Sequence, residues 1–187
     1  MVRAIVPALR MLAVMTVVVG MLYPLAIWGV GRLAFSDRAD GSLVMADGEI
    51  AGSALIGQAF EGPEWFTGRP DAYDPAASAP SNLGPTNPAL GDLVSERLEA
   101  IVAGNDVEAD VPVDAVTGSG SGLDPHISPA YARLQAPRVA EAVGLDLREV
   151  MALIDEHTTG RTFGFLGEPR VHVLELNLAL VASASSP

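Results

Sequence analysis

Serine, aspartate and histidine side chains with catalytic potential lie close together at Ser119, Ser121, Asp124 and His126. A hydroxyl, an imidazole and a carboxylate are the groups of a serine hydrolase, in which the imidazole takes the hydroxyl proton. The spacing argues against that chemistry, because neither serine has a glycine both two residues before and two residues after it, as a nucleophile elbow requires. An aspartate and a histidine two residues apart also rarely align as orienting group and base. A hydrolase using Ser121, Asp124 and His126 is therefore the weakest interpretation.

The glycine-rich stretch at residues 118–122 does not match the nucleotide-binding loops. Leu123 and Pro125 stand where G-x-G-x-x-G needs its third glycine, and the chain has no lysine for a P-loop. Backbone N–H groups in such a loop can bind an anion, but a tight turn is the simpler interpretation.

Metal binding and nucleic-acid binding find no support in the composition. The histidines, His126, His157 and His172, lack the spacing of metal ligands, and His157 is expected near a helix C-terminus, where an imidazolium is favourable. The chain has no cysteine, which excludes disulfides and thiolate sites. With 11 arginines against 23 acidic residues the net charge is −12, so the chain is a poor match for a row of phosphates.

The periodicity predicts an α+β domain with a mixed sheet, in the order β-β-α-β-α-α-β. Strands are expected at 43–46, 50–60, 111–117 and 171–182, helices at 88–104, 129–144 and 147–154, and a turn region at 161–169. The apolar phase of the last strand slips between Val173 and Leu174, which is typical of a bulge or of a strand buried on both faces. Glu175 and Asn177 would share one side of that strand, most simply a solvated face.

The helices carry recognisable start signals. Asp146 with Glu149 forms an Asp-type capping box, and Pro137 is expected to kink its helix because it donates no hydrogen bond. The other two helices begin with a cap residue followed by proline, at Asn87–Pro88 and Ser128–Pro129.

A long segment rich in Pro, Gly, Asn and Ser occupies residues 62–88. Loops longer than about 15 residues inside compact domains are usually functional or disordered. Trp65, Phe66 and Tyr73 lie within it, and disordered linkers seldom hold several aromatic residues. We therefore expect an ordered loop that is held against another surface.

Residues 11–30 form a run without a charge, long enough at about 1.5 Å per residue to span a bilayer core of about 30 Å. A cleaved signal peptide has a shorter apolar region, so a retained anchor is favoured. We expect a cytoplasmic N-terminus at 1–10, a transmembrane helix at 11–33 and an extracytoplasmic α/β domain at 34–187. The orientation follows from the positive-inside rule, since Arg3 and Arg10 precede the run without acids, whereas acids accompany the arginines after it.

Thr16, Gly20 and Pro24 recur every four residues and share one helical face. Small residues in such a stripe allow another transmembrane helix to approach closely. A lone anchor also tolerates Gly and Pro, so both interpretations stay open. Because the helix has no ionisable residue, it cannot conduct ions by itself.

Six stretches in register resemble the C subunit of the bacterial Kdp potassium-transporting P-type ATPase, over essentially the whole chain. Two departures lie in loops: ASAP at 77–80 replaces a glycine-rich approach, and Gly118 stands where the family often has alanine. The matching stretches are GSALIGQ at 52–58, FTGRP at 66–70, SNLGPTNP at 81–88, VPVDAVTGSGSGLDPHIS at 111–128, QAPRVA at 135–140 and GEPRVHVLELNLAL at 167–180.

The resemblance implies a non-catalytic accessory subunit of an ATP-driven potassium importer in the bacterial cell membrane. Its partners would be a channel-like subunit that carries the ion and a P-type pump subunit that hydrolyses ATP. The implied role is to stabilise assembly and to act as a catalytic chaperone that raises the ATP affinity of the pump subunit. No permanently bound cofactor is implied, but transient ATP binding shared with the pump subunit is.

For the ATP role, the resemblance points to Gln135 and Arg138, an amide suited to a nucleobase edge and a guanidinium suited to a phosphate. The expected topology conflicts with this, because an exported domain would not meet cytosolic ATP. We favour a structural role for Gln135, satisfying backbone groups at the Pro137 kink. Docking on the outer face of the channel subunit is the alternative use of the loops, with candidate residues Trp65, Phe66, Arg69, Asn82, Ser121, Asp124 and His126.

Outside the family, a solitary exported binding module remains an alternative to the subunit interpretation. Such a module would copurify with nothing, and its transmembrane stripe would tolerate Gly20→Leu.

Overall fold

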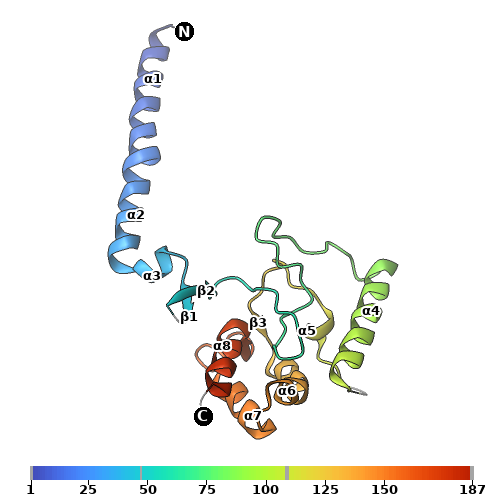
Figure 1. Cartoon of the computed structure of the whole chain (residues 1–187). Helices are drawn as coiled ribbons and strands as arrows, with labels where there is room; N and C mark the ends of the chain where they lie inside the picture. Colours follow the sequence, from blue (N-terminus) through green and yellow to red (C-terminus); the bar gives the residue numbers. More distant parts are fainter. Residues whose placement is uncertain (1, 47, 108–109, 186–187) are drawn as a thin grey trace. The chain divides into compact units, whose positions relative to one another are not determined.

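The computed structural model describes residues 2–46, 48–107 and 110–185. The chain divides into two compact units, with the boundary between Leu43 and Val44. The first unit contains a long apolar helix built from α1 (Val2–Val17), a π-helical turn η1 (Val18–Leu22) and α2 (Tyr23–Ala34), followed by the short α3 (Ser36–Ala39) (Figure 1). Residues Ala4–Ala34 are long and apolar enough to cross a membrane, and the most apolar 18-residue window among them has mean hydropathy 2.2 and is not buried within the chain. The predicted apolar helix is therefore present.

The π-helical turn ends two residues before Pro24. Pro24 has no N–H to donate to the preceding turn, and its ring crowds the carbonyl four residues back. The Tyr23 N–H donates to the Val18 carbonyl, five residues back, which widens the helix at this point. The stripe of Thr16, Gly20 and Pro24 thus includes the site of the π turn.

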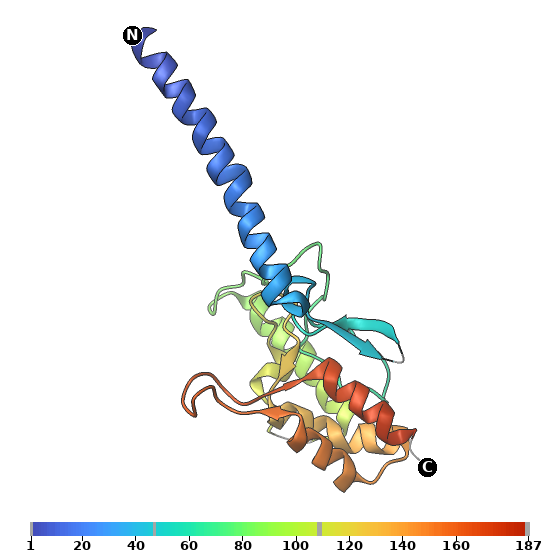
Figure 2. The same ribbon diagram turned by 90° about the vertical axis from the view of Figure 1, so that its left-hand side faces the viewer.

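The second unit is an α+β domain, as the sequence predicted, and its strands form small sheets. β1 (Leu43–Ala46) pairs with β2 (Glu49–Ser53), and β3 (His126–Ile127), β5 (Arg170–His172) and β4 (Thr158–Thr159) form an antiparallel sheet in the order β3-β5-β4. The helices are α4 (Pro88–Asn105), α5 (Val113–Val116), α6 (Pro129–Val143), α7 (Leu147–Glu156) and α8 (Val173–Ala184). Figure 1 shows α6, α7 and α8 gathered around one core, and Figure 2 shows the β4–β5 connection reaching away from them.

The caps that the sequence predicted are confirmed. The Asn87 and Ser128 side chains accept hydrogen bonds from backbone N–H groups in the first turns of α4 and α6. Asp146 and Glu149 form the complete capping box of α7. His157 follows α7 as its C-cap.

The prediction of a strand at 171–182 is wrong beyond His172. The chain forms only three strand residues and then turns into α8, whose buried Val173, Leu176 and Leu180 follow the helical spacing i, i+3, i+7. The phase slip between Val173 and Leu174 was the change from strand period to helix period. Glu175 and Asn177 consequently do not share a solvated strand face: Glu175 is exposed, and Asn177 is buried in the domain.

Of the other strand predictions, the one at 50–60 is wrong in part and the one at 111–117 is wrong throughout. Of residues 50–60, only those up to Ser53 belong to β2, and the rest is irregular because Gly57 hydrogen-bonds across to Leu123 instead of to a neighbouring strand. In the segment 111–117, Val113–Val116 form the short helix α5. Pro112 starts this helix, and the Thr117 hydroxyl donates back to the Val113 carbonyl, which favours a helical turn over a strand.

The core contains side chains from all three C-terminal helices and from the loop at 62–88. The fully buried members include Phe66, so this part of the loop is held against the domain. The largest buried side chains are Tyr131, Phe66, Ile154, Leu176, Leu180, Gln135, Val139, Val150, Val171 and Asn177.

The Tyr73 side chain fixes the path of the loop because it packs against two glycines, Gly57 and Gly68. Its hydroxyl donates to the Arg69 carbonyl at 3.0 Å, and burial raises the pKa of this phenol well above its usual value. A Cβ on Gly68 would lie 2.1 Å from the Tyr73 hydroxyl, and one on Gly57 would lie 2.4 Å from the ring and 2.6 Å from the Asp124 carbonyl oxygen. Glycine is required at both positions because neighbouring atoms leave no room for a side chain. The two glycines belong to the stretches GSALIGQ and FTGRP that carry the family resemblance.

Replacement of Gly57 is expected to destabilise the domain. In Gly57→Ala the new methyl group meets a backbone carbonyl that cannot move freely, so we expect a loss of about 1–3 kcal/mol in the free energy of unfolding, measured by denaturant unfolding of the full chain in detergent. The matched control is Gly91→Ala in α4, where a Cβ meets nothing within 4 Å and alanine is the better helix former. Equal stability of the Gly57→Ala chain and the wild type would contradict the close approach.

Candidate functional site

Two buried side-chain amides hold the loop at 62–88 by its backbone. Asn177 on α8 accepts from the Phe66 N–H and donates to the Phe66 carbonyl, both at 2.9 Å. Gln135 on α6 does the same for the next residue, accepting from the Thr67 N–H at 2.8 Å and donating to the Thr67 carbonyl at 3.1 Å. Gln135 is 0% exposed and Asn177 1%. Inside the domain, their amides supply the backbone hydrogen bonds that a neighbouring strand would otherwise provide.

Arg138 extends this arrangement towards the start of the loop. Its guanidinium donates to the carbonyls of Pro63 at 2.6 Å and Trp65 at 3.1 Å, and to the Gln135 amide oxygen at 2.9 Å. Burial lowers the pKa of Arg138 from its ordinary value. Gln135 and Arg138, the residues to which the resemblance assigns ATP, are therefore neighbours, and both hydrogen-bond to the loop backbone. Arg138 also donates to the Asn105 amide oxygen at the end of α4, at 2.9 Å. The backbone groups that Gln135 satisfies belong to Thr67 and not to the Pro137 turn.

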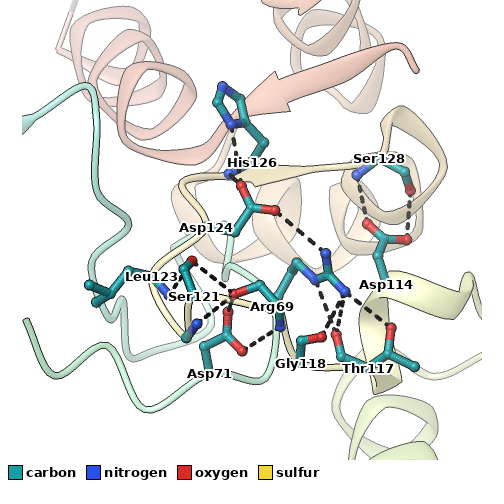
Figure 3. Close-up of polar contacts among 12 residues, drawn as sticks. Arg69, Asp71, Asp114, Thr117, Gly118, Ser121, Leu123, Asp124, His126 and Ser128 are labelled. Carbon is teal, nitrogen blue, oxygen red and sulfur yellow. Dashed lines mark hydrogen bonds and ion pairs between the residues drawn. The ribbon is translucent and has the colours of Figure 1, made fainter. Parts of the chain in front are cut away.

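A second polar cluster, shown in Figure 3, ties the loop to the glycine-rich turn. Arg69 donates to the carbonyls of Thr117 and Gly118 at 2.9–3.1 Å and lies 3.5 Å from an Asp124 carboxylate oxygen. Asp71 accepts from both the N–H and the hydroxyl of Ser119, at 2.8 and 2.6 Å. The glycine-rich stretch is thus held as a turn, as expected.

Asp124 and His126 meet, but they do not complete a hydrolase. Asp124 Oδ1 lies 3.0 Å from the His126 N–H and 3.3 Å from its Nδ1, and the carboxylate is partly buried. Burial acts to raise the pKa of Asp124, but the hydrogen bonds and charge of His126, together with Arg69, outweigh it and leave the pKa below its ordinary value. The Ser121 hydroxyl is engaged with the Leu123 N–H and the Ser119 hydroxyl, and in Figure 3 the His126 ring points away from it.

A cleft of about 280 Å³ beside the loop is lined by Phe60, Thr67, Tyr73, Arg97 and Tyr131, among others. Arg97 donates to the carbonyls of Pro70 at 2.9 Å and Val116 at 3.2 Å. Burial raises the pKa of Tyr131, whose hydroxyl lies 3.4 Å from that of Thr67. These polar groups therefore hold the domain together around the cleft.

The candidate docking residues occupy different environments. Phe66 is buried in the core, while Trp65 is half-buried with its ring 5.9 Å from that of Phe60. Asn82 is exposed, with φ 56° and its side-chain amide donating to the Pro80 carbonyl. Arg69, Ser121, Asp124 and His126 belong to the cluster of Figure 3.

Sequence reasoning missed several residues on which this geometry depends. Asn177 was assigned to a solvated face, and Thr67 and Asp71 were not singled out, although both adjoin or belong to the FTGRP stretch. Asp114 was also missed: it accepts from the Ser128 N–H and hydroxyl at 2.6 and 2.9 Å, at the start of α6. The sequence did carry a signal that Asn177 is buried, because it stands inside an apolar run with helical spacing. Across the described residues, no group of three or more His, Cys, Asp or Glu is placed to hold a metal ion.

Comparison with known proteins relates nearly the whole chain to one family. The family described as "KdpC: K+-transporting ATPase, c chain" matches residues 5–182. The Potassium-transporting ATPase KdpC subunit of Mycobacterium bovis is 55% identical over 184 residues, which cover 95% of this chain and 97% of the relative. The subunits of the same name from Paraburkholderia phytofirmans and Kineococcus radiotolerans are 53% and 54% identical, covering 93% and 94% of this chain and 94% and 92% of theirs.

The pairing of Asn177 with the loop backbone predicts a large effect of an isosteric apolar substitution. In Asn177→Leu the N–H and carbonyl of Phe66 lose their partners inside the core, and we expect a loss of roughly 2–4 kcal/mol in the free energy of unfolding. The measurement is denaturant unfolding of the full chain in detergent.

The control for this variant is Glu99→Leu on the exposed face of α4, which is expected to change stability by less than about 0.5 kcal/mol. A wild-type stability in Asn177→Leu would show that the loop backbone finds other partners.

Proposed function

Since this chain belongs to the KdpC family and is a non-catalytic subunit of the Kdp potassium-transporting ATPase complex, we propose that its domain lies outside the cytoplasmic membrane and stabilises the assembled complex. The partners are the other Kdp subunits. The observation that carries the proposal is the loop at 62–88, which has no helix or strand before Pro88 and whose backbone is held by side chains of α6 and α8.

The way this loop is held favours a docking surface over a ligand site. The charged and amide side chains around it, including Gln135, Arg138 and Arg69, donate to or accept from the chain's own backbone. Most side chains between 71 and 88 are exposed. Because residues 63–69 are fixed in this way, the part of the loop next to them loses less conformational freedom when a partner binds, which favours association.

The apolar helix supplies a second surface for assembly. Its side chains are exposed in the isolated chain, so lipid or other transmembrane helices must cover them. A Cβ added at Gly20 would meet only the Thr16 methyl group, at 3.9 Å, so this face of the helix offers room for another helix to approach closely.

A role in raising the ATP affinity of the pump subunit is the second part of what the family resemblance implies. A direct nucleotide contact by Gln135 would require its amide to leave the Thr67 backbone, and Arg138 would have to leave the carbonyls of the loop. The extracytoplasmic placement also separates the domain from cytosolic ATP. These contacts support the assembly role over direct nucleotide binding.

The topology is tested by labelling single cysteines introduced at Ser78 and Ser185, both exposed, with a membrane-impermeant thiol reagent in intact cells. We expect labelling from outside, because the arginines flanking the helix favour a cytoplasmic N-terminus. The native chain has no cysteine and serves as the blank. Protection until the cells are opened would overturn the topology and make ATP binding by Gln135 the mechanism to test.

Assembly is tested by copurification of the other Kdp subunits with tagged variants. Gly20→Leu places a bulky side chain on the stripe, and Ala76→Trp places one on the exposed loop, so each is expected to lower the recovered complex about tenfold, equivalent to ~1.4 kcal/mol.

Matched controls place the same side chains elsewhere. Val18→Leu lies on another face of the same helix, and Glu99→Trp lies on the exposed face of α4; both are expected to assemble normally. Full recovery of the complex with Ala76→Trp would show that the loop is not a docking surface. Full recovery with Gly20→Leu would show that the stripe does not pack against another helix.

A further inference from the structure

His172 lies where strand β5 gives way to helix α8. It is the last residue of β5 and the N-cap of α8, and it is only 8% exposed. The next residue, Val173, donates its N–H to the Pro125 carbonyl at 3.0 Å. The imidazole therefore lies at a junction between the sheet, the last helix and the segment before β3.

Both ring nitrogens of His172 have backbone partners, and these partners fix its protonation. The Glu175 N–H, in the first turn of α8, points to Nδ1 at 3.3 Å, and the Ala54 carbonyl oxygen lies 3.1 Å from Nε2. An amide N–H can only donate and a carbonyl can only accept. Nδ1 must therefore carry a lone pair and Nε2 the proton, which is the neutral imidazole.

The groups around His172 come from several elements. Glu175 lies on α8, Asp124 precedes β3, and the His126 ring packs edge-on against His172 with centroids 5.1 Å apart, directly across the antiparallel pair. The segment 54–58 has no ionisable side chain, and β4 contributes only threonines. On α6, which also packs on β5, the phenol of Tyr131 has a raised pKa and stays neutral near pH 6.

We propose that His172 is a proton-sensitive latch, which in its neutral form caps α8 and holds the segment at Ala54, and which opens when Nδ1 takes up a proton. A proton on Nδ1 would face the Glu175 N–H and abolish the cap. The new positive charge would also lie at the N-terminus of α8, where the helix dipole disfavours cations. The imidazolium is then better accommodated in water, which requires the ring to leave Ala54.

The direction of the pH effect follows from the burial of the ring. Burial lowers the pKa of His172, and the neighbouring His126 acts in the same direction, while the Ala54 hydrogen bond, Glu175 and Asp124 act against it. The unfolded chain has the ordinary value of 6.5. The folded form therefore loses stability as the pH falls through about 6.5 towards the native pKa, and the effect fades at higher pH. That the pH in question is the external one rests on the proposed topology.

The test is hydrogen–deuterium exchange of the full chain in detergent between pH 7.5 and 5, corrected for the intrinsic pH dependence of amide exchange. We expect the protection of the Glu175 amide and of segment 54–58 to fall by up to about tenfold per pH unit below 6.5. In His172→Asn, asparagine still caps α8 but cannot titrate, so this step is expected to disappear. His157→Asn, at the C-cap of α7, is the control that keeps the step.

A second measurement does not depend on a variant that folds. Side-chain ¹⁵N NMR of the wild-type chain should show His172 with its proton on Nε2 and still neutral below pH 6.5. A proton on Nδ1, titration at 6.5 or above, or an exchange step that survives in His172→Asn would each overturn the latch. None of these outcomes depends on which side of the membrane the domain lies, so the latch and the proposed topology are tested separately.

Discussion

The fold of the domain depends on the need to satisfy the backbone of a buried segment that belongs to no helix or strand. Phe66 is in the core, so its N–H and carbonyl are removed from water, where an unpaired backbone group is costly. Asn177 pairs with that residue and Gln135 with the next, one from α8 and one from α6. The two helices and the loop are therefore mutually dependent, since the loop cannot stay buried without the amides, and the amides cannot stay buried without the loop.

The same principle explains the clusters around the loop. Arg138, Arg97 and Arg69 direct their guanidinium groups at carbonyls of this chain, and Asp71 and Asp114 accept from the backbone and hydroxyl of Ser119 and Ser128. These residue types resemble those of a catalytic or anion-binding site when they are read from the sequence. In the folded chain they replace the regular hydrogen bonding that a long irregular loop lacks, which agrees with membership of a non-catalytic subunit family.

Local signals were readable in the sequence, and long-range pairings were not. The caps at Asn87, Ser128 and Asp146 were predicted because each bonds to backbone groups within a few residues. The strand predicted at 171–182 was wrong beyond His172 because its run of Val and Leu fits both the strand period and the helix period. The polar Asn177 did not decide between them, since it is buried against a distant partner. Asn177 reaches Phe66 across a separation of 111 residues, which periodicity cannot show.

The glycine-rich turn and the loop illustrate why a family resemblance identified the chain better than any motif did. Gly57 and Gly68 are required because Tyr73 lies against both, and Gly57 also lies close to the carbonyl of Asp124, which follows the glycine-rich turn. Such requirements impose residue types at scattered positions with no chemical signature of their own. In this chain such stretches are required by packing and by backbone pairing, which periodicity and short motifs do not reveal.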